Sequence, residues 1–222
     1  MAFNQSLIEK TVKNGMISGN VSKRYLIMKR IFDITFSLCA LIILSPLFII
    51  VAIAIKIDSK GPVFFIQKRC KFNGEVFNIY KFRSMVANAP EMQKELEKIN
   101  EVKGAMFKSK KDPRVTRVGK FIRKTSIDEL PQLINVLKGE MSIVGPRPPI
   151  VEETERYDKW HYLRLSVKPG LTGLWQVKGR STVGFEEMVR LDLKYIRERS
   201  FLYDLKIILK TLPVLFGDDK TC

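Results

Sequence analysis

The longest apolar stretch of the chain covers residues 31–55 and contains one charged side chain, Asp33. A helix of about 20 apolar residues crosses a bilayer, so this stretch is long enough to enter a membrane. Ser45 and Pro46 interrupt it near its centre, where the proline ring and the missing N–H force a kink. Lysine and arginine flank both ends, as is typical of cytoplasmic flanks. Two interpretations stay open: one spanning helix, or a bent re-entrant helix whose ends lie on the same side.

Two segments rich in strand-forming residues follow, at positions 63–71 and 75–83. Asn73 and Gly74 lie between them, and this pair favours the tight turn of a β-hairpin. We therefore predict an antiparallel hairpin whose second strand ends with Lys81 and Arg83 on one face. We interpret these two cations as phosphate contacts, because further cations follow in the chain. Simple surface charge is the alternative.

Helical signals dominate the rest of the chain. Apolar side chains at helical spacing and capping residues predict helices at 88–100, 115–124, 157–165, 185–199 and 201–216. The last segment has lysines opposite its apolar face. This pattern fits ordinary core packing and also fits a helix that lies in the plane of a membrane surface. A hairpin among helices predicts the α+β class.

Charge narrows the range of partners. The 222 residues contain 39 Lys and Arg against 23 Asp and Glu, a formal net charge of +16. This surplus predicts an anionic partner, such as nucleic acid, anionic lipid or a phosphorylated substrate. The three cysteines show no metal-binding spacing and His161 is the single histidine, so we do not expect a zinc site.

The strongest chemical signal lies in residues 112–149. Two adjacent carboxylates, Asp128 and Glu129, follow a run of cations that includes Arg114, Arg117 and Arg123. Carboxylates among cations can hold a metal-bound phosphate while one of them stays ready to attack it. At a helix N-terminus among cations, the pKa of Asp128 is expected to be low. We expect one of the two carboxylates to act as a nucleophile and the other as a metal ligand.

A simpler hypothesis explains the same carboxylates without chemistry. Ser126 and Glu129 match a capping box in which Ser126 is the N-cap. Pro131 would then fall inside the helix and remove a hydrogen bond. A helix that starts nearer Asp128 places Pro131 in the first turn, where its missing N–H costs little. Further on, neighbouring prolines restrict Arg147, and a rigid guanidinium suits bidentate phosphate binding.

Several long segments, in the same order, resemble the bacterial sugar transferases, the monotopic phosphoglycosyl transferases. They read KRIFDITFSLCALIILSP, IYKFRSM, DPRVTRVGKFIRKTSIDELPQLINVLKGEMSIVGPRP and KPGLTGLWQVKGR. The resemblance runs from about residue 29 to residue 217 and is to the minimal catalytic form of the family. It implies a tail at 1–28, a re-entrant membrane helix at 29–58, a cytosolic transferase domain at 59–217 and a tail at 218–222. The implied α+β fold has a Ser-Pro break in that helix, a hairpin, and a mainly helical domain with membrane-interface helices.

The resemblance also implies a reaction. Members of the family move a sugar-1-phosphate from a UDP-sugar to undecaprenyl phosphate with Mg²⁺ and release UMP. By this likeness Asp128 attacks the β-phosphate and forms a covalent phosphosugar intermediate, which the lipid phosphate then attacks. Glu129, together with Asp128, belongs to the Mg²⁺ site. Ser45 and Pro46 match the break of the family's re-entrant helix, which favours the re-entrant topology over simple spanning.

A set of residues is expected to contact phosphate, nucleotide or sugar. The motifs of the family point to Arg123, Pro146, Arg147 and Pro148, and analogy alone points to Gln176 and Arg180. The residues themselves suggest Lys81, Arg83, Arg114 and Arg117 in addition.

The expected location is the cytoplasmic face of the bacterial inner membrane. The expected partners are a UDP-sugar, undecaprenyl phosphate and downstream glycosyltransferases, with a homodimer as a further expectation and no nucleic acid. The sugar stays open among galactose, glucose and N-acetylated or diamino sugars, and the glycan among exopolysaccharide, capsule, O-antigen and glycoprotein glycan. Two alternatives remain: a non-catalytic basic membrane scaffold, and a transferase that acts by direct displacement without a covalent step.

Overall fold

The computed structural model describes residues 21–89, 91–92, 112–178 and 183–215. The N-terminal tail, most of the helix predicted at 88–100, and Arg180 lie outside these residues. In chain order the helices and strands are α2 (Lys23–Ile43), α3 (Ser45–Asp58), β1 (Phe64–Cys70), η1 (Phe72–Gly74), β2 (Val76–Phe82), α5 (Arg117–Lys124), η3 (Ile127–Gln132), α6 (Leu133–Lys138), β3 (Ser142–Val144), α7 (Val151–Thr154), η4 (His161–Ser166), β4 (Gly170–Thr172), α8 (Leu174–Lys178), α9 (Phe185–Glu198) and α10 (Phe201–Leu215).

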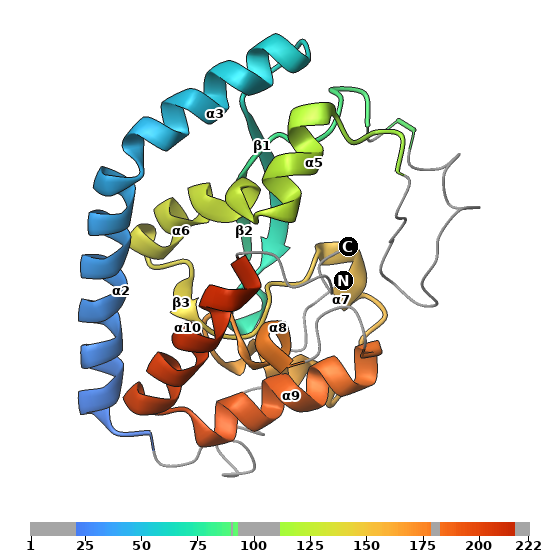
Figure 1. The fold of residues 1–222 in the computed structure, drawn as a ribbon. Helices are drawn as coiled ribbons and strands as arrows, with labels where there is room; N and C mark the ends of the chain where they lie inside the picture. Colours follow the sequence, from blue (N-terminus) through green and yellow to red (C-terminus); the bar gives the residue numbers. More distant parts are fainter. Residues whose placement is uncertain (1–20, 90, 93–111, 179–182, 216–222) are drawn as a thin grey trace.

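The apolar stretch folds as two helices that meet at a bend of 60°. Figure 1 shows α2 and α3 as a long bent pair along one side of the molecule. Pro46 lies in the first turn of α3, and the hydroxyl of Ser45 donates to the carbonyl of Ile42 at 2.8 Å. Within the described residues, no single helix is long and apolar enough to cross a bilayer, whereas the bent pair passes that test together. The break therefore lies where the Ser-Pro dipeptide predicts it.

Much of the apolar surface of this pair faces outward. Exposed members include Leu26, Ile27, Ile31, Leu38, Ile42, Ile43, Ile49, Ile50, Ile53 and Ile57. The exposed fraction of Ile57 reaches 82%. Large continuous apolar surfaces of this kind mark membrane or protein contacts.

The predicted hairpin is confirmed. Strands β1 and β2 pair antiparallel, with Phe64 opposite Phe82 and Cys70 opposite Val76. Asn73 and Gly74 have φ angles of 55° and 74°, in the left-handed region that Asn and Gly tolerate best. The last part of β1 also pairs with the chain that follows Arg147, through an isolated bridge between Arg69 and Ile150.

A second, parallel pair of strands lies in the core. Strands β3 and β4 pair Ser142 with Gly170, and the N–H of Gly170 donates to the carbonyl of Pro146 at 2.8 Å. A Cβ atom on Gly170 would collide with the backbone nitrogen of Gly145, so the close approach of these strands requires glycine. The core around them is formed by Leu133, Val136, Ile143, Val144, Tyr195, Ile196 and Ile207, among others.

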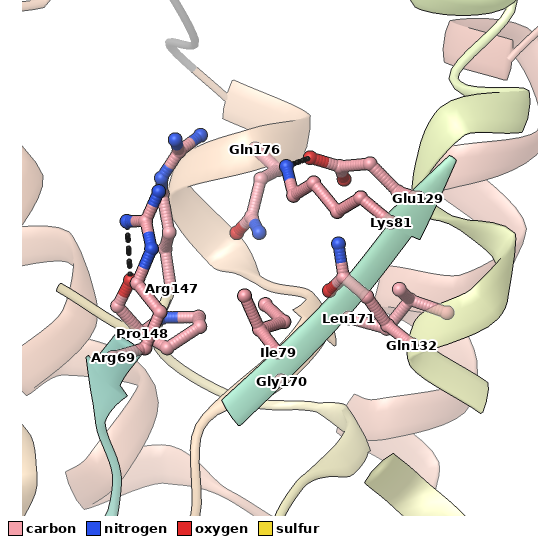
Figure 2. A pocket seen from close by; sticks show the side chains of 10 residues that line it. All are labelled: Arg69, Ile79, Lys81, Glu129, Gln132, Arg147, Pro148, Gly170, Leu171 and Gln176. Atoms are coloured by element: carbon pink, nitrogen blue, oxygen red, sulfur yellow. Dashed lines mark hydrogen bonds and ion pairs between the residues drawn. The ribbon is translucent and has the colours of Figure 1, made fainter. Parts of the chain in front are cut away.

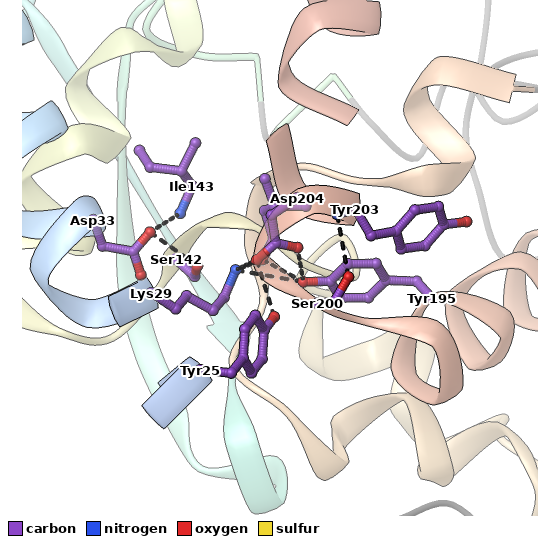
Figure 3. A network of polar contacts seen from close by, with 10 residues as sticks. Tyr25, Lys29, Asp33, Ser142, Ile143, Tyr195, Ser200, Tyr203 and Asp204 are labelled. Atoms are coloured by element: carbon purple, nitrogen blue, oxygen red, sulfur yellow. Dashed lines mark hydrogen bonds and ion pairs between the residues drawn. The ribbon is translucent and has the colours of Figure 1, made fainter. Parts of the chain in front are cut away.

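Helix α2 is attached to this core by polar contacts. The carboxylate of Asp33 accepts from the N–H of Ile143 at 2.9 Å and from the hydroxyl of Ser142 at 3.1 Å. The ammonium of Lys29 lies 2.7 Å from Asp204 of α10, and Tyr25 donates to the same carboxylate (Figure 3). These buried contacts explain why a charged residue interrupts an otherwise apolar stretch.

Helix α3 is attached differently, through apolar packing. Val51 and Ile55 pack with Phe82 of β2 and Ile122 of α5 in a second buried cluster. One polar contact joins the same elements, because Asp58 accepts from the N–H of Val118 at 2.9 Å. The two arms of the bent pair therefore contact different parts of the domain.

The C-terminal helices follow the predicted pattern with one exception. Helices α9 and α10 match the segments predicted at 185–199 and 201–216. The helix predicted at 157–165 is wrong in type, since the structure has turns followed by the 3-10 helix η4. Helix α10 buries Asp204 and Ile207 while Leu202, Leu209 and Leu212 stay exposed, so it has both a core face and an outward apolar face.

Replacing Asp33 tests the attachment of α2. Asp33→Ala leaves the N–H of Ile143 and the hydroxyl of Ser142 buried without a partner, which should cost about 2–4 kcal/mol. We expect the midpoint of thermal unfolding, measured in nanodiscs, to fall by about 5–15 °C. The matched control is Thr35→Ala on the exposed face of the same helix. Equal midpoints for both variants would contradict the contact.

Candidate active site

The adjacent carboxylates lie in a 3-10 helix that a left-handed residue introduces. Helix α5 ends at Lys124, and Ser126 has a φ angle of 56°. The N–H of Ser126 donates to the carbonyl of Arg123, and η3 then begins with Asp128 and Glu129 in its first turn. Non-glycine residues rarely adopt this conformation, and such strain often accompanies functional sites.

The capping-box hypothesis is wrong. The side chain of Ser126 makes no capping hydrogen bond, and its backbone is left-handed rather than extended. Ser126 thus ends α5 in the position that glycine usually occupies after a helix. Pro131 lies within η3, and the regular α-helix α6 starts only at Leu133.

Glu129 is held by a cation from the hairpin. The ammonium of Lys81 on β2 lies 2.6 Å from Oε1 of Glu129. Burial works to raise the pKa of Glu129, but the positive charges of Lys81 and Arg147 outweigh it and hold the pKa at about 2. Glu129 is therefore ionised at neutral pH and available as a metal ligand.

Asp128 experiences a different balance. Burial raises the pKa of Asp128 to about 6, and the negative charge of Glu129 adds to this shift against the opposing pull of Lys81 and Arg123. The expected lowering is therefore wrong, because the desolvation of the carboxyl group exceeds the attraction of the cations. Asp128 is still mostly ionised at neutral pH.

A pocket opens beside Glu129. Its lining residues are Arg69, Ile79, Lys81, Glu129, Gln132, Arg147, Pro148, Gly170, Leu171 and Gln176 (Figure 2). They come from β1, β2, η3, β4, α8 and the segment after β3. Lys81, Glu129, Arg147, Pro148 and Gln176, all predicted from the sequence, therefore meet at one place. Pro146 is buried beside this pocket and accepts from Gly170.

Three predicted phosphate-contacting arginines lie elsewhere. Arg83 is buried and donates to the carbonyls of Ser59 and Lys60 at the end of α3. Arg114 forms a buried ion pair with Asp112 at 2.6 Å. Arg117 is exposed in the first turn of α5. The structure gives the first two packing roles, and none of the three lines the pocket.

Arg123 and Arg180 stand apart from these. Arg123 is exposed in the last turn of α5, yet its charge acts on the pKa of Asp128. Arg180 lies outside the described residues. Arg69 and Gln132 line the pocket but were not predicted. In the sequence Arg69 reads as one more surface cation of a strand, and its pairing with the segment after Arg147 is a long-range contact.

Asp128 and Glu129 each offer at least one carboxylate oxygen. This set of donors suits Mg²⁺, whose other ligands would be water and phosphate oxygens. Elsewhere in the described chain, ligand atoms of Asp158, His161 and Glu186 lie within 4.8 Å of one another. The Nδ1 atom of His161 accepts from the N–H of Asp158, so its Nε2 atom carries hydrogen and donates to Glu186. This group is joined by internal hydrogen bonds and does not present a free imidazole nitrogen.

Comparison with known proteins gives the family. The chain matches the model of the family described as "Bacterial sugar transferase" over residues 24–218. It is 51% identical over 192 residues to the protein named galactosyl transferase CpsE of Streptococcus agalactiae serotype III. The matched residues cover 86% of this chain and 42% of that protein. The chain belongs to the bacterial sugar transferase family.

Two further relatives differ in length. The exopolysaccharide production protein ExoY of Sinorhizobium fredii is 43% identical over 193 residues, or 85% of each chain. The protein named undecaprenyl-phosphate galactose phosphotransferase of Salmonella typhimurium is 46% identical over 209 residues, which cover 91% of this chain and 44% of that protein. The chain thus spans less than half of two of these relatives and most of the third.

Substitution of Ser126 separates the two accounts of this residue. If the role of Ser126 is to adopt the left-handed conformation, Ser126→Gly should leave the free energy of unfolding unchanged or raise it by up to about 1 kcal/mol. Ser126→Val should lower it by about 1–2 kcal/mol. Thermal unfolding in nanodiscs measures both. A marked loss on Ser126→Gly would instead favour a side-chain role in capping.

Proposed function

We propose that the protein transfers a sugar-1-phosphate from a UDP-sugar to undecaprenyl phosphate and releases UMP. The observation that carries this proposal is the pocket itself, where Glu129 lies with Lys81 and Arg147. Asp128 is the next residue in the chain and does not itself line the pocket, but the charges of Lys81 and Glu129 act on its pKa. Transfer between two anionic substrates needs charge neutralisation, and these cations supply it. The printed name of the Salmonella relative supports the same acceptor and reaction class.

In the proposed reaction, a carboxylate oxygen of Asp128 attacks the β-phosphorus of the donor. The bond between that phosphorus and the bridging oxygen breaks, and its electron pair leaves with UMP. An oxygen of the lipid phosphate then attacks the same phosphorus and releases the carboxylate of Asp128. A nucleophile must be ionised, and the pKa of about 6 keeps Asp128 in this form near neutral pH while retaining basicity.

Mg²⁺ is part of the proposal. Glu129 and Asp128 would hold it, and it would neutralise negative charge on the phosphates of the donor. Lys81 keeps the Glu129 carboxylate ionised and oriented, since the two groups lie 2.6 Å apart. The role of Lys81 in this scheme is to position a metal ligand.

The bent pair α2–α3 would place this chemistry at the cytoplasmic face of the bacterial inner membrane. Its exposed apolar side chains, its 60° bend and the cations at both ends support a re-entrant helix in one leaflet. The exposed leucines of α10 would rest at the same surface. The product would then enter the synthesis of a surface glycan by downstream glycosyltransferases, as the name of the ExoY relative suggests.

Release of UMP tests the reaction and names the sugar. We would incubate the protein in nanodiscs with Mg²⁺, undecaprenyl phosphate and a panel of UDP-sugars. One or two sugars should support UMP release, and Asp128→Asn should lower the rate by about 10⁴-fold or more because it removes the nucleophile. Glu129→Gln should raise the Mg²⁺ concentration needed for half-maximal rate.

The control is Glu155→Gln, which removes an exposed carboxylate outside the pocket. Normal turnover by Asp128→Asn would contradict the nucleophile assignment. Incorporation of labelled UMP into the UDP-sugar without lipid acceptor indicates the covalent route. Turnover without such exchange would indicate direct displacement instead.

A further inference from the structure

Arg69 is a buried cation at the wall of the pocket. It lies near the end of β1, and 8% of its surface is exposed. Its Nε and Nη2 atoms donate to the side-chain oxygen of Gln67 at 3.1 and 2.8 Å. Its Nη1 atom donates to the carbonyl of Pro148 at 3.0 Å. Three contacts from two sides fix the plane of the guanidinium group.

All of these acceptors are uncharged. Arg114 and Arg164, also buried, each pair with an aspartate at 2.6 Å. Arg83, like Arg69, has only carbonyl acceptors, but these lie at the C-terminal end of α3, whereas Arg69 lines the pocket. Within the described residues, no carboxylate lies within ion-pair distance of Arg69. A buried charge with no carboxylate in direct contact is costly unless another anion completes the site.

A second guanidinium group stands next to the first. Arg147 lies on the same side of the pocket as Arg69, and the Lys81–Glu129 pair lies on the opposite side (Figure 2). Burial lowers the pKa of Arg69 to about 10, and the positive charge of Arg147 adds to this shift, against the opposing charges of the more distant carboxylates Glu153, Glu129 and Glu152. The side chain of Arg147 makes no hydrogen bond within the described chain. Its Cζ atom lies over the ring of Trp175, 5.9 Å from the ring centroid. Two neighbouring cations that repel each other are stabilised by an anion between them.

The remaining donors fit a phosphate group. A guanidinium group has five N–H donors, and the contacts to Gln67 and Pro148 use three of those of Arg69. Two donors stay available, and Arg147 can add its own planar pair. Arginines in this arrangement bind tetrahedral oxyanions by paired, charge-assisted hydrogen bonds.

We propose that Arg69 and Arg147 form a phosphate clamp that holds a substrate phosphate across the pocket from Glu129. Gln67 and the carbonyl of Pro148 are the positioning groups that orient Arg69. This inference rests on the proposed function. The bound group is a phosphate other than the one that Asp128 attacks. Two sources share this chemistry: the phosphate that leaves as UMP, and the phosphate of the lipid acceptor.

The experiment measures binding, without turnover. We would determine the dissociation constants of UMP and of a short-chain polyprenyl phosphate for the full chain in nanodiscs at fixed ionic strength. Arg69→Gln should weaken one of them by about 10- to 100-fold, and Arg69→Lys should recover only part of the loss, since an ammonium group lacks the planar pair of donors. Loss with UMP alone assigns the clamp to the nucleotide, and loss with the lipid phosphate alone assigns it to the acceptor.

Gln67→Glu gives a second, sharper variant. It places a carboxylate where the side-chain oxygen of Gln67 accepts from Arg69, so that Arg69 gains an ion pair. Thermal stability should therefore stay the same or rise, while phosphate binding weakens. A purely structural role for Arg69 predicts no change in binding. The matched control is Lys68→Gln, which removes one charge from the exposed position between these two residues.

The outcomes separate this inference from the proposed function. Unchanged binding of both ligands in Arg69→Gln and Gln67→Glu, or no measurable binding of either ligand by the native protein, would overturn the clamp. Binding that depends on Arg69 in a protein that releases no UMP from any donor would retain the clamp and reject the reaction. Normal turnover, together with binding that Arg69→Gln does not change, would reject the clamp and retain the reaction.

Discussion

The structure depends first on the carboxylate of Asp33. A single buried side chain from an apolar helix accepts two hydrogen bonds from β3, the strand that leads directly to Arg147. Lys29 and Tyr25, on the same side of α2, meet the carboxylate of Asp204. Arg30 of the same helix adds two hydrogen bonds, to the carbonyls of Val136 and Leu137 in α6, at 2.7 and 2.8 Å. Because buried polar groups demand partners in one defined geometry, they fix the rotation and the height of α2 relative to the strand.

The candidate site combines segments that lie far apart in the sequence. Lys81 comes from the hairpin, Glu129 from η3, Arg147 from the chain after β3, and Gln176 from α8. The hairpin connects two of these parts, since β1 pairs with the segment after Arg147 while β2 carries Lys81. Within the pocket, the Lys81–Glu129 pair lies on one side, next in the chain to Asp128, and the guanidinium groups of Arg69 and Arg147 lie on the other. The diphosphate donor of the proposed reaction would fit this arrangement, because one phosphorus would react while the other stays bound.

Sequence reasoning succeeded where the determining signal is local. The hairpin follows from Asn73 and Gly74, the helix break from Ser45 and Pro46, and the pair of carboxylates from adjacency alone. It failed where a side chain finds its partner across the fold. Arg83 and Arg114 have the composition of phosphate ligands, yet their partners are a helix end and Asp112, which charge counting does not reveal. Arg69 shows the opposite error, since an ordinary strand cation becomes buried through pairing with a distant segment. Ser126 was misread because the local pattern fits a helix start, whereas its φ angle of 56° ends the preceding helix.

The two arms of the bent pair contact different parts of the domain, and this arrangement has a mechanical consequence. Helix α2 is joined through Asp33 to the strand before Arg147, while α3 packs on α5, the helix before the carboxylates. If the pair rests in one leaflet as proposed, the angle at Leu44 is set partly by the thickness and lateral pressure of the surrounding lipid. A change in that angle would displace α5 relative to β3, the elements that precede the carboxylates and Arg147 in the chain. The lipid would then act as more than a solvent for the proposed acceptor, because its elastic properties would influence the relative position of the segments that carry the site.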